Sequence, residues 1–268
     1  MTTALSHAVL KSRALISLSG EDWRDFLQGL ITQDVETLTP GQARFGALLT
    51  PQGRLLFDLF VVGREDGAWL DVLAESRQAL ILRLSMYRLR AKVTIAVDKT
   101  PVAALFGDGQ APQGWIADPR LQGLGWRGYG LPAPVGALEL DESAYDCHRM
   151  ALGVPGPADW GSEKTYPIEA NFDLLHGIDF QKGCFVGQET TSRMKRRGQI
   201  KNRMLPITFD GAPPAFDAEL LTGDRRAGEV LSGQEGRAMA LVRLDRIDGD
   251  LTVDGKAVRV DRPDWLPL

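Results

Sequence analysis

The last quarter of this 268-residue chain is a succession of short strand-like runs, and this pattern restricts the fold more than any other feature of the sequence. Turn-forming pairs such as Asp210-Gly211 and Asp254-Gly255 separate the runs, and closely spaced strands joined by such turns favour antiparallel pairing. The runs cover residues 204–209, 219–221, 228–231, 238–244, 251–253 and 257–260. We therefore expect a small antiparallel β-barrel over residues 199–268.

The first part of the chain mixes strand and helix periodicities instead. Trp23, Phe26, Leu27 and Leu30 recur at helical spacing and form one apolar stripe, as in a helix that packs on a sheet. Strand-like runs at 12–18, 43–50, 54–63, 68–73 and 91–97 accompany this helix and a second helical pattern at 75–89. The order β-α-β-β-β-α-β is close to a ferredoxin-like α+β unit with one added strand, which we place at residues 1–98.

The middle of the chain, residues 99–198, has a weaker pattern. Val102–Phe106 is typical of a strand, and residues 142–152 are typical of a helix that ends at Gly153. These elements predict a second α+β domain over residues 99–198, which can interleave with the first.

Charge and hydropathy exclude several classes of protein. The 31 Lys and Arg residues against 35 Asp and Glu give a net charge of −4, which argues against a chain that coats nucleic acid or an anionic membrane. The longest apolar run, residues 55–62, contains Asp58 and is far shorter than the roughly 20 residues that cross a bilayer. Lys11 and Arg13 stand where a secretory signal needs apolar residues. We expect a cytoplasmic protein with no membrane partner.

The segment 176–203 combines reactive and basic side chains with glycine, which is typical of a functional loop and not of a core strand. Cys184 follows Lys182 by two residues, and a cation beside a thiol favours the nucleophilic, metal-binding thiolate. The alternative is that Cys184 is a small buried apolar residue. Because the chain has only two cysteines, too few for a permanent iron-sulfur site, any cluster would be borrowed or bridged.

Neighbouring residues of this segment admit two interpretations each. Gly183 and Gly187 can let the backbone turn around a ligand, or can simply end a strand. Glu189 can accept paired hydrogen bonds from a heterocycle, or can form an ion pair with Arg193 four residues later.

Residues 193–203 hold six cations and no acid. Such a run is often only a solvated surface, but it can also attract phosphate, RNA, an acidic protein or the glutamate tail of a folate. No aromatic residue lies among the cations, which weakens the case for single-stranded nucleic acid.

Four ordered motifs resemble those of the YgfZ-type folate-binding family. The motif GIDFQKGCFVGQE with the following TTSR and GQIKNR resembles the family signature. Upstream, FLQGLITQDV at 26–35, LLTPQGRLLFDLFV at 48–61 and YRLRAKVTI at 87–95 are similar to its other landmarks in the same order. Together they touch most of the chain.

The resemblance implies a fold related to the aminomethyltransferase of the glycine cleavage system. Two α+β domains and a C-terminal β-barrel would form a cloverleaf around a central channel that receives tetrahydrofolate. The reactive residue would be Cys184, tuned by Lys182, with no permanent metal and with Cys184 as a transient iron ligand. The implied folate-binding residues are Asp58, Gly183, Gly187, Gln188, Glu189 and Arg193.

One departure bears on activity. The transferase resembles this chain around GRLLFDL but has two adjacent acids there, and Phe57 stands where the first, catalytic acid is expected. Phenylalanine cannot accept a proton, so the resemblance favours a pocket without that chemistry.

Three hypotheses follow. The first is a tetrahydrofolate-binding accessory factor in iron-sulfur cluster assembly or repair, whose partners are folate and assembly or client proteins. The second is a folate-dependent one-carbon transferase that uses Asp58. The third is an RNA- or protein-binding module through residues 193–203, although nothing else in the chain favours nucleic acid.

Overall fold

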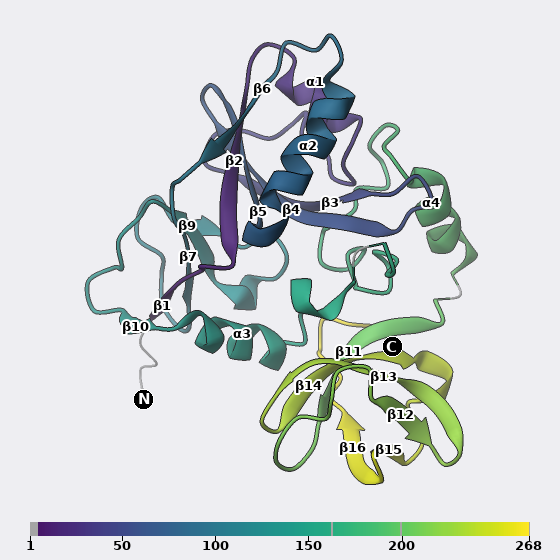
Figure 1. Cartoon of the computed structure of the whole chain (residues 1–268). Coiled ribbons are helices and arrows are strands. Elements are labelled where there is room, and N and C mark those ends of the chain that lie inside the picture. The colour runs from purple at the N-terminus through teal and green to yellow at the C-terminus, as the bar shows by residue number, and fades with distance from the viewer. Residues whose placement is uncertain (1–4, 162, 199, 268) are drawn as a thin grey trace.

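The protein has three lobes in the computed structural model, which describes residues 5–161, 163–198 and 200–267 (Figure 1). Two lobes contain five-stranded sheets and the third is a closed barrel. The predicted α+β class with a C-terminal antiparallel barrel is therefore confirmed. The predicted domains also include residues 1–4, 162, 199 and 268, which lie outside the described residues.

The first sheet has the strand order β3-β4-β5-β2-β6, and all its neighbours are antiparallel. Its strands are β2 (Arg13–Ser19), β3 (Ala43–Leu49), β4 (Leu55–Arg64), β5 (Gly67–Leu73) and β6 (Thr94–Asp98). The helices α1 (Trp23–Gln28) and α2 (Arg77–Arg88), the latter preceded by the 3-10 turn η1 (Ala74–Ser76), cover one face. Their buried Leu27, Leu80 and Leu84 supply the apolar stripes that the sequence predicts.

The second sheet has the order β10-β1-β7-β9-β8. Its elements are β1 (Ser6–Val9), β7 (Val102–Phe106), β8 (Ile116–Ala117), η2 (Gln122–Leu124), β9 (Trp126–Tyr129), β10 (Leu138–Leu140) and α3 (Glu142–Ala151). β1 lies in the segment predicted as the first domain, yet it pairs with β7 and β10 in this sheet. The described part of the chain thus passes through the second sheet at β1 before it enters the first at β2.

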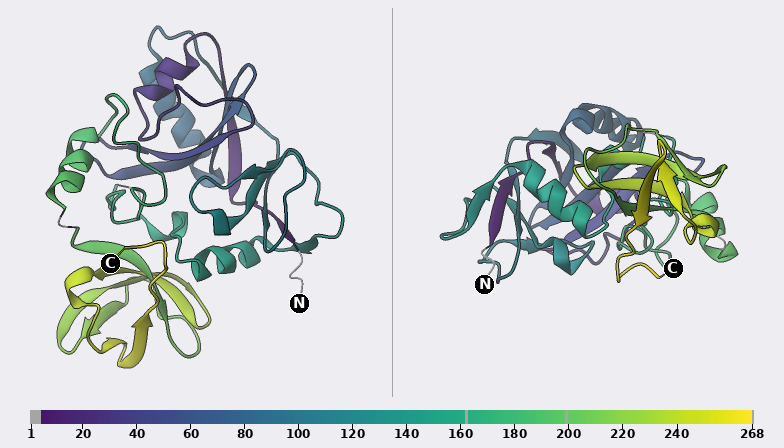
Figure 2. Two further views of the ribbon diagram at one scale, coloured as in Figure 1. Left: turned by 180° about the vertical axis from the view of Figure 1, so that it is seen from behind. Right: turned by 90° about the horizontal axis from the view of Figure 1, so that it is seen from below.

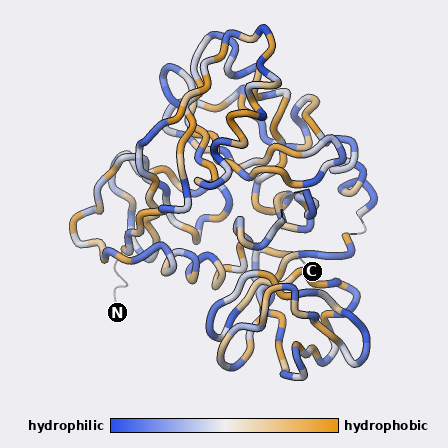
Figure 3. Tube along the Cα trace, viewed as in Figure 1, coloured by the Kyte–Doolittle hydropathy of each residue, from blue (hydrophilic) through white to orange (hydrophobic). Residues whose placement is uncertain are grey.

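The barrel closes in the order β11-β14-β13-β12-β15-β16. Its strands are β11 (Asn202–Thr208), β12 (Glu219–Thr222), β13 (Arg225–Gln234), β14 (Arg237–Arg243), β15 (Leu251–Val253) and β16 (Lys256–Val260), with η4 (Leu244–Arg246) between β14 and β15. Each corresponds to one predicted run. Hydrophobic residues follow its strands and hydrophilic residues dominate the connections (Figure 3).

A long irregular segment between α3 and the barrel fills the middle of the cloverleaf (Figure 2). It begins with η3 (Pro157–Asp159) and ends with α4 (Gln188–Arg197). Phe172 packs in one core with Phe45 of the first sheet and Met239 of the barrel. The guanidinium of Arg203 on β11 donates to both carboxylate oxygens of Asp173, at 2.9 and 3.0 Å, and fastens the segment to the barrel.

The two sheets meet at a buried chain of alternating charges. Arg13 donates to Asp58 at 2.9 Å and to Asp71 at 2.7 Å. Asp71 also accepts a hydrogen bond from Arg127 of the second sheet, and Arg127 donates to Asp118 at 3.2 Å. Arg120 completes the chain with two bonds to Asp118 at 2.8 and 2.9 Å. Three cations and three anions therefore neutralise one another away from water.

The aromatic ring of Phe60 on β4 packs against the three arginines of this buried charge network. The ring lies 3.7 Å from the guanidinium carbon of Arg127, 4.9 Å from that of Arg120 and 5.5 Å from that of Arg13. A cation over an aromatic face is attracted by the ring quadrupole, and more strongly where water is excluded. The aromatic ring therefore holds the three guanidinium groups at fixed positions between the sheets.

We expect Asp118→Asn to reduce the acid sensitivity of the fold. Although burial opposes ionisation, Arg120 and Arg127 lower the pKa of the Asp118 carboxyl to about 2, against about 3.9 in an unfolded chain. Its stabilisation is therefore present above about pH 4 and is lost as the pH falls through about 2, with roughly 1 kcal/mol gone by pH 3.

Urea unfolding of both chains at about pH 6 and about pH 3 measures this effect. The difference in unfolding free energy between the native chain and the variant should shrink at the lower pH. Asp224→Asn, on an exposed turn, is the control. An equal difference at both pH values would contradict the assignment.

Candidate functional site

Cys184 is exposed, on the loop that leads into α4. The side chain of Asp179 shapes this loop by accepting from the backbone N–H groups of Gln181 and Lys182, at 2.7 and 3.1 Å. Phe185, beside the cysteine, is buried in the core. The loop is therefore fixed on both sides of a thiol that faces solvent, and the alternative of a buried apolar cysteine is wrong.

Lys182 is buried and directs its ammonium group away from solvent into the first lobe. The Nζ atom donates to the backbone carbonyls of Gln28 and Ile31 at 2.7 Å and of Gln33 at 2.9 Å. Three donors are the full capacity of an ammonium group. The predicted electrostatic action of Lys182 on Cys184 has no support in this geometry; the lysine instead anchors the loop.

This anchor lies at the C-terminal end of α1. Gln28 is the last residue of that helix, where unpaired carbonyls and the helix dipole attract a cation. Burial lowers the pKa of Lys182 to about 8 and outweighs the opposing effect of the nearby Asp34 and Asp179. The group is still protonated at neutral pH, so all three hydrogen bonds are available.

Gly187 brings the hairpin tip of β3 and β4 against the start of α4. It adopts a left-handed conformation with φ of 80°, and an added Cβ would lie 2.6 Å from the carbonyl oxygen of Thr50. Gly53, from the predicted Pro51-Gln52-Gly53 turn, packs equally closely against Thr190. Gly187 therefore has a structural role here, whereas nothing lies within 4 Å of a Cβ added at Gly183.

The remaining predicted residues near Cys184 lie on α4. Gln188 and Glu189 form its first turn. The Glu189 carboxylate is 3.7 Å from the Arg193 guanidinium, in an exposed i,i+4 pair, which is the ion-pair alternative that the sequence allowed.

The basic segment 193–203 is divided by the fold. Arg203 is buried against Asp173, and Lys195 lies 3.6 Å from the same residue. Arg196, Arg197 and Lys201 are exposed. Arg196 and Arg197 thus lie in the last turn of α4, and Lys201 lies between α4 and β11. Gln199 lies outside the described residues.

Asp58 lies apart from Cys184 in the charge chain between the sheets. Its carboxylate is bound to Arg13, and it lines a small cleft of about 120 Å³ together with Phe57 and Trp160. Cys184 does not line this cleft.

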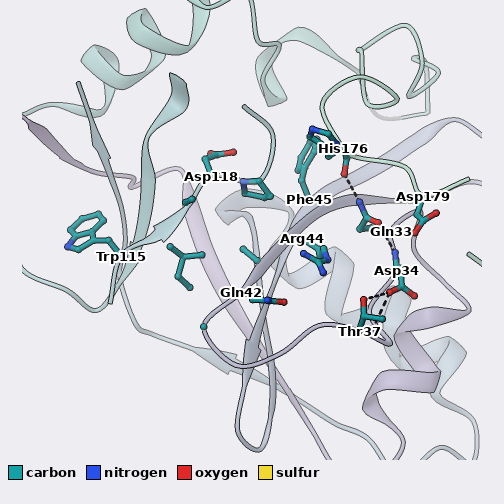
Figure 4. A pocket seen from close by; sticks show the side chains of 15 residues that line it. Gln33, Asp34, Thr37, Gln42, Arg44, Phe45, Trp115, Asp118, His176 and Asp179 are labelled. Atoms are coloured by element: carbon teal, nitrogen blue, oxygen red, sulfur yellow. Dashed lines mark hydrogen bonds between the residues drawn. The ribbon is translucent and has the colours of Figure 1, made fainter. Parts of the chain in front are cut away.

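A larger cleft, of about 670 Å³, opens between the first lobe, the second lobe and the middle segment (Figure 4). Gln33, Asp34 and Arg44 line it from the first lobe, Trp115 from the second and His176 from the middle segment. A neighbouring cleft of about 550 Å³ shares His176 and extends to Trp265 near the C-terminus. All three lobes therefore border this region.

Arg44 lies in the middle of the larger cleft between Trp115 and Asp34 (Figure 4). It is half-buried, and its side chain has no hydrogen bond or ion pair to another described residue. Phe45 and Asp179 also line the space. The cleft thus combines an uncompensated cation with aromatic rings and carboxylates, a set that suits an aromatic ligand with an anionic end.

Sequence reasoning missed these cleft residues, and Gln33 and His176 lay in quoted motifs without a predicted role. The sequence did contain an indication that Arg44 has a functional role, because an arginine is unusual among the apolar residues of the strand-like run 43–50. No predicted folate-binding residue lines this cleft.

No helix in the described part of the chain is both long and apolar enough to cross a membrane. Within the same residues, no group of three or more His, Cys, Asp and Glu side chains is placed to hold a metal ion.

We expect Lys182→Met to lower the unfolding free energy by about 2 kcal/mol, because three buried carbonyls lose their donor. Urea unfolding measures the loss, and hydrogen exchange at Gln181 and Lys182 should accelerate. Lys201→Met, at an exposed site, is the matched control. A variant with unchanged stability and an altered pH profile of Cys184 alkylation would instead favour direct action on the thiol.

Comparisons with known proteins agree with this architecture. The family described as the CAF17 C-terminal β-barrel domain matches residues 201–268. The crystal structure of the glycine cleavage system aminomethyltransferase T from Bartonella henselae superposes with a TM-score of 0.78 over 98% of this chain and 86% of that one. At 17% identity, this likeness concerns the fold alone.

Sequence relatives are more informative. The human iron-sulfur cluster assembly factor IBA57, mitochondrial, is 30% identical in an alignment of 303 positions. The alignment covers 96% of this chain and 84% of the human protein. IBA57 homologues are 36% identical in Phaeosphaeria nodorum and 33% identical in Mycosarcoma maydis, over 87% and 77% of this chain. The matches span 63% and 58% of those two longer proteins.

The relatives contradict the predicted cytoplasmic localisation, because these proteins are named as mitochondrial. The prediction relied on a missing secretory pattern around Lys11 and Arg13, and that feature does not separate the cytoplasm from the mitochondrion. The predicted relationship to the mitochondrial assembly factor is confirmed. With this identity and coverage, the chain belongs to the IBA57 family of iron-sulfur cluster assembly factors.

Proposed function

We propose that this protein is an accessory factor in iron-sulfur cluster assembly that offers the Cys184 thiol to a partner protein and binds tetrahydrofolate. The observation that carries the first part is an exposed thiol on a loop fixed by Lys182 and Asp179. The names of the relatives support the same process.

A partner is needed because this chain offers too few ligands. Typical clusters are held by four cysteine thiolates, and the second cysteine of the chain, Cys147, lies on α3 and contacts Gln234 of the barrel. Cys184 therefore supplies one ligand, and the partner supplies the others. The exposed cations Arg196 and Arg197, at the C-terminal end of α4, and Lys201, beyond it, favour a partner with an acidic surface.

Tetrahydrofolate fits the larger cleft by the chemistry of its walls. The Asp179 carboxylate, whose Oδ1 atom accepts from the loop backbone, would accept N–H groups of the pterin at its other oxygen, and Trp115 would contact the pterin ring. Arg44, without a protein partner, would bind the glutamate tail. The volume of about 670 Å³ lies within the range of small-molecule sites.

The other two hypotheses gain less from the structure. A one-carbon transferase needs a free carboxylate, but Asp58 is buried and bound to Arg13, and Phe57 beside it is apolar. The hypothesis of an RNA-binding module is weakened, because Arg203, one of the cations of residues 193–203, is buried against Asp173.

In a strain that lacks its own IBA57-type protein, we expect Cys184→Ser to fail to restore the activity of four-iron enzymes. A serine hydroxyl is a poor soft-metal ligand, whereas the fold should be unaffected at an exposed position. Enzyme activity in extracts measures the effect, with Cys147→Ser as the matched control. Full activity of the Cys184 variant would refute the thiol role.

We expect Arg44→Gln to weaken tetrahydrofolate binding about tenfold or more, since charge-assisted hydrogen bonds contribute about 1.5–3 kcal/mol. Calorimetric titration measures the Kd, and Arg225→Gln on the barrel is the control. Tetrahydropterin, which lacks the glutamate tail, should bind both chains equally. A native chain that shows no heat with tetrahydrofolate would refute folate binding, and a loss for tetrahydropterin too would refute the role of Arg44.

A further inference from the structure

Helix α2 carries apolar side chains on its outer face as well as on its inner one. Leu80 and Leu84 pack into the core beneath the helix. On the opposite side, Leu82, Met86 and Leu89 are 60%, 71% and 88% exposed. Their i, i+4, i+7 spacing aligns them on one line along the helix and past its end. The folding of the lobe uses only the inner face, so the outer stripe is left without a partner.

The charged residues of the segment that carries this stripe have one sign. Residues 76–97 contain five cations and no acid, in a chain whose net charge is −4. Of these cations, Arg83, Arg88 and Arg90 flank the stripe, and their side chains have no hydrogen bond or ion pair to another described residue. We call Leu82, Met86, Leu89 and these three arginines the α2 surface.

Leu89 is an unusual residue for the end of a helix. It is the C-cap of α2 and has φ of 44° and ψ of −107°, a region in which L-residues with bulky side chains are strained. Helices commonly place glycine or asparagine where the backbone turns left-handed. The side chain of Leu89 is exposed and does not belong to the core of the lobe, so packing within the lobe does not offset this strain.

We propose that the α2 surface is a docking site for a folded protein that presents an apolar groove with an acidic rim. Interface centres are enriched in Met and Arg and depleted in Lys, Glu and Asp, which is the composition of this surface. Three unpaired arginines around an apolar stripe complement such a rim, and they also steer the partner during association. Arg88, Leu89 and Arg90 of the YRLRAK motif, which the Cys184 loop does not use, belong to this surface.

A lipid membrane is a poorer occupant for the same geometry. Helices that lie in a membrane interface insert a broad apolar face with aromatic anchors. The broad apolar face of α2 is buried in its own lobe, and Tyr87 packs against that core. The outer stripe is one side chain wide and lacks an aromatic residue.

Photo-crosslinking followed by a binding measurement tests the proposal. Benzoylphenylalanine is placed at Met86 of the full chain in the organism that encodes it, and at the exposed Leu138 of β10 as the control. We expect one protein to crosslink from position 86 only, through a peptide with Asp or Glu beside apolar residues.

The crosslinked protein is then purified and titrated with the full chain. We expect the triple variant Arg83→Glu, Arg88→Glu, Arg90→Glu to bind at least about tenfold more weakly. The matched triple Arg225→Glu, Lys256→Glu, Arg259→Glu, on the exposed barrel, should bind like the native chain. Circular dichroism confirms that both variants are folded.

Four outcomes would overturn the proposal. These are equal crosslinking from both positions, a crosslinked surface without acids, an unchanged Kd for the α2 triple variant, and crosslinking that moves to lipid. The lipid outcome is tested directly with vesicles of equal parts phosphatidylcholine and cardiolipin. We expect these vesicles to bind the native chain and the α2 triple variant equally, because the proposed partner is a protein.

Discussion

The buried chain of three arginines and three aspartates between the two sheets is the interaction on which the arrangement of the lobes depends. Each charge has lost its hydration, so each carboxylate needs its guanidinium neighbour at hydrogen-bond distance. A shift of one sheet against the other would leave a charge unpaired away from water, which typically costs several kcal/mol. The network thus fixes the relative position of the sheets more strictly than apolar packing does.

The same network connects architecture with the larger cleft. Asp118 belongs to the charge chain and also lines the cleft beside Trp115. Because Arg127 and Arg120 hold Asp118, the wall contributed by the second lobe has a defined distance from Arg44 on the first. A cleft bordered by separate lobes retains its shape only if such a connection is rigid, and a preformed shape lowers the ordering cost of binding.

Three of the four sequence motifs converge on the Cys184 loop. The motif at 26–35 provides the carbonyls that hold Lys182, and the hairpin of the motif at 48–61 contacts Gly187. The conspicuous residues around Cys184 therefore position the thiol, while Cys184 itself stays free of the core. The fourth motif, at 87–95, points away from this assembly and forms part of the α2 surface. The first lobe thus holds the Cys184 loop in place and, on another side, presents the surface that we propose for docking.

The sequence by itself determined the local elements, because hydrophobic periodicity and turn chemistry act over a few residues. The six barrel strands and the two helices of the first lobe could be predicted this way, whereas the sequence left open whether Cys184 is exposed or buried. The partners of Lys182 and Arg13, and the place of the Arg44 side chain in the larger cleft, were decided only by tertiary structure. Lys182 reaches carbonyls about 150 residues away in sequence, and Arg13 meets Asp71 across 58. A buried charge selects whichever opposite dipole or charge the fold brings within about 3 Å, and no local pattern in the sequence encodes that meeting.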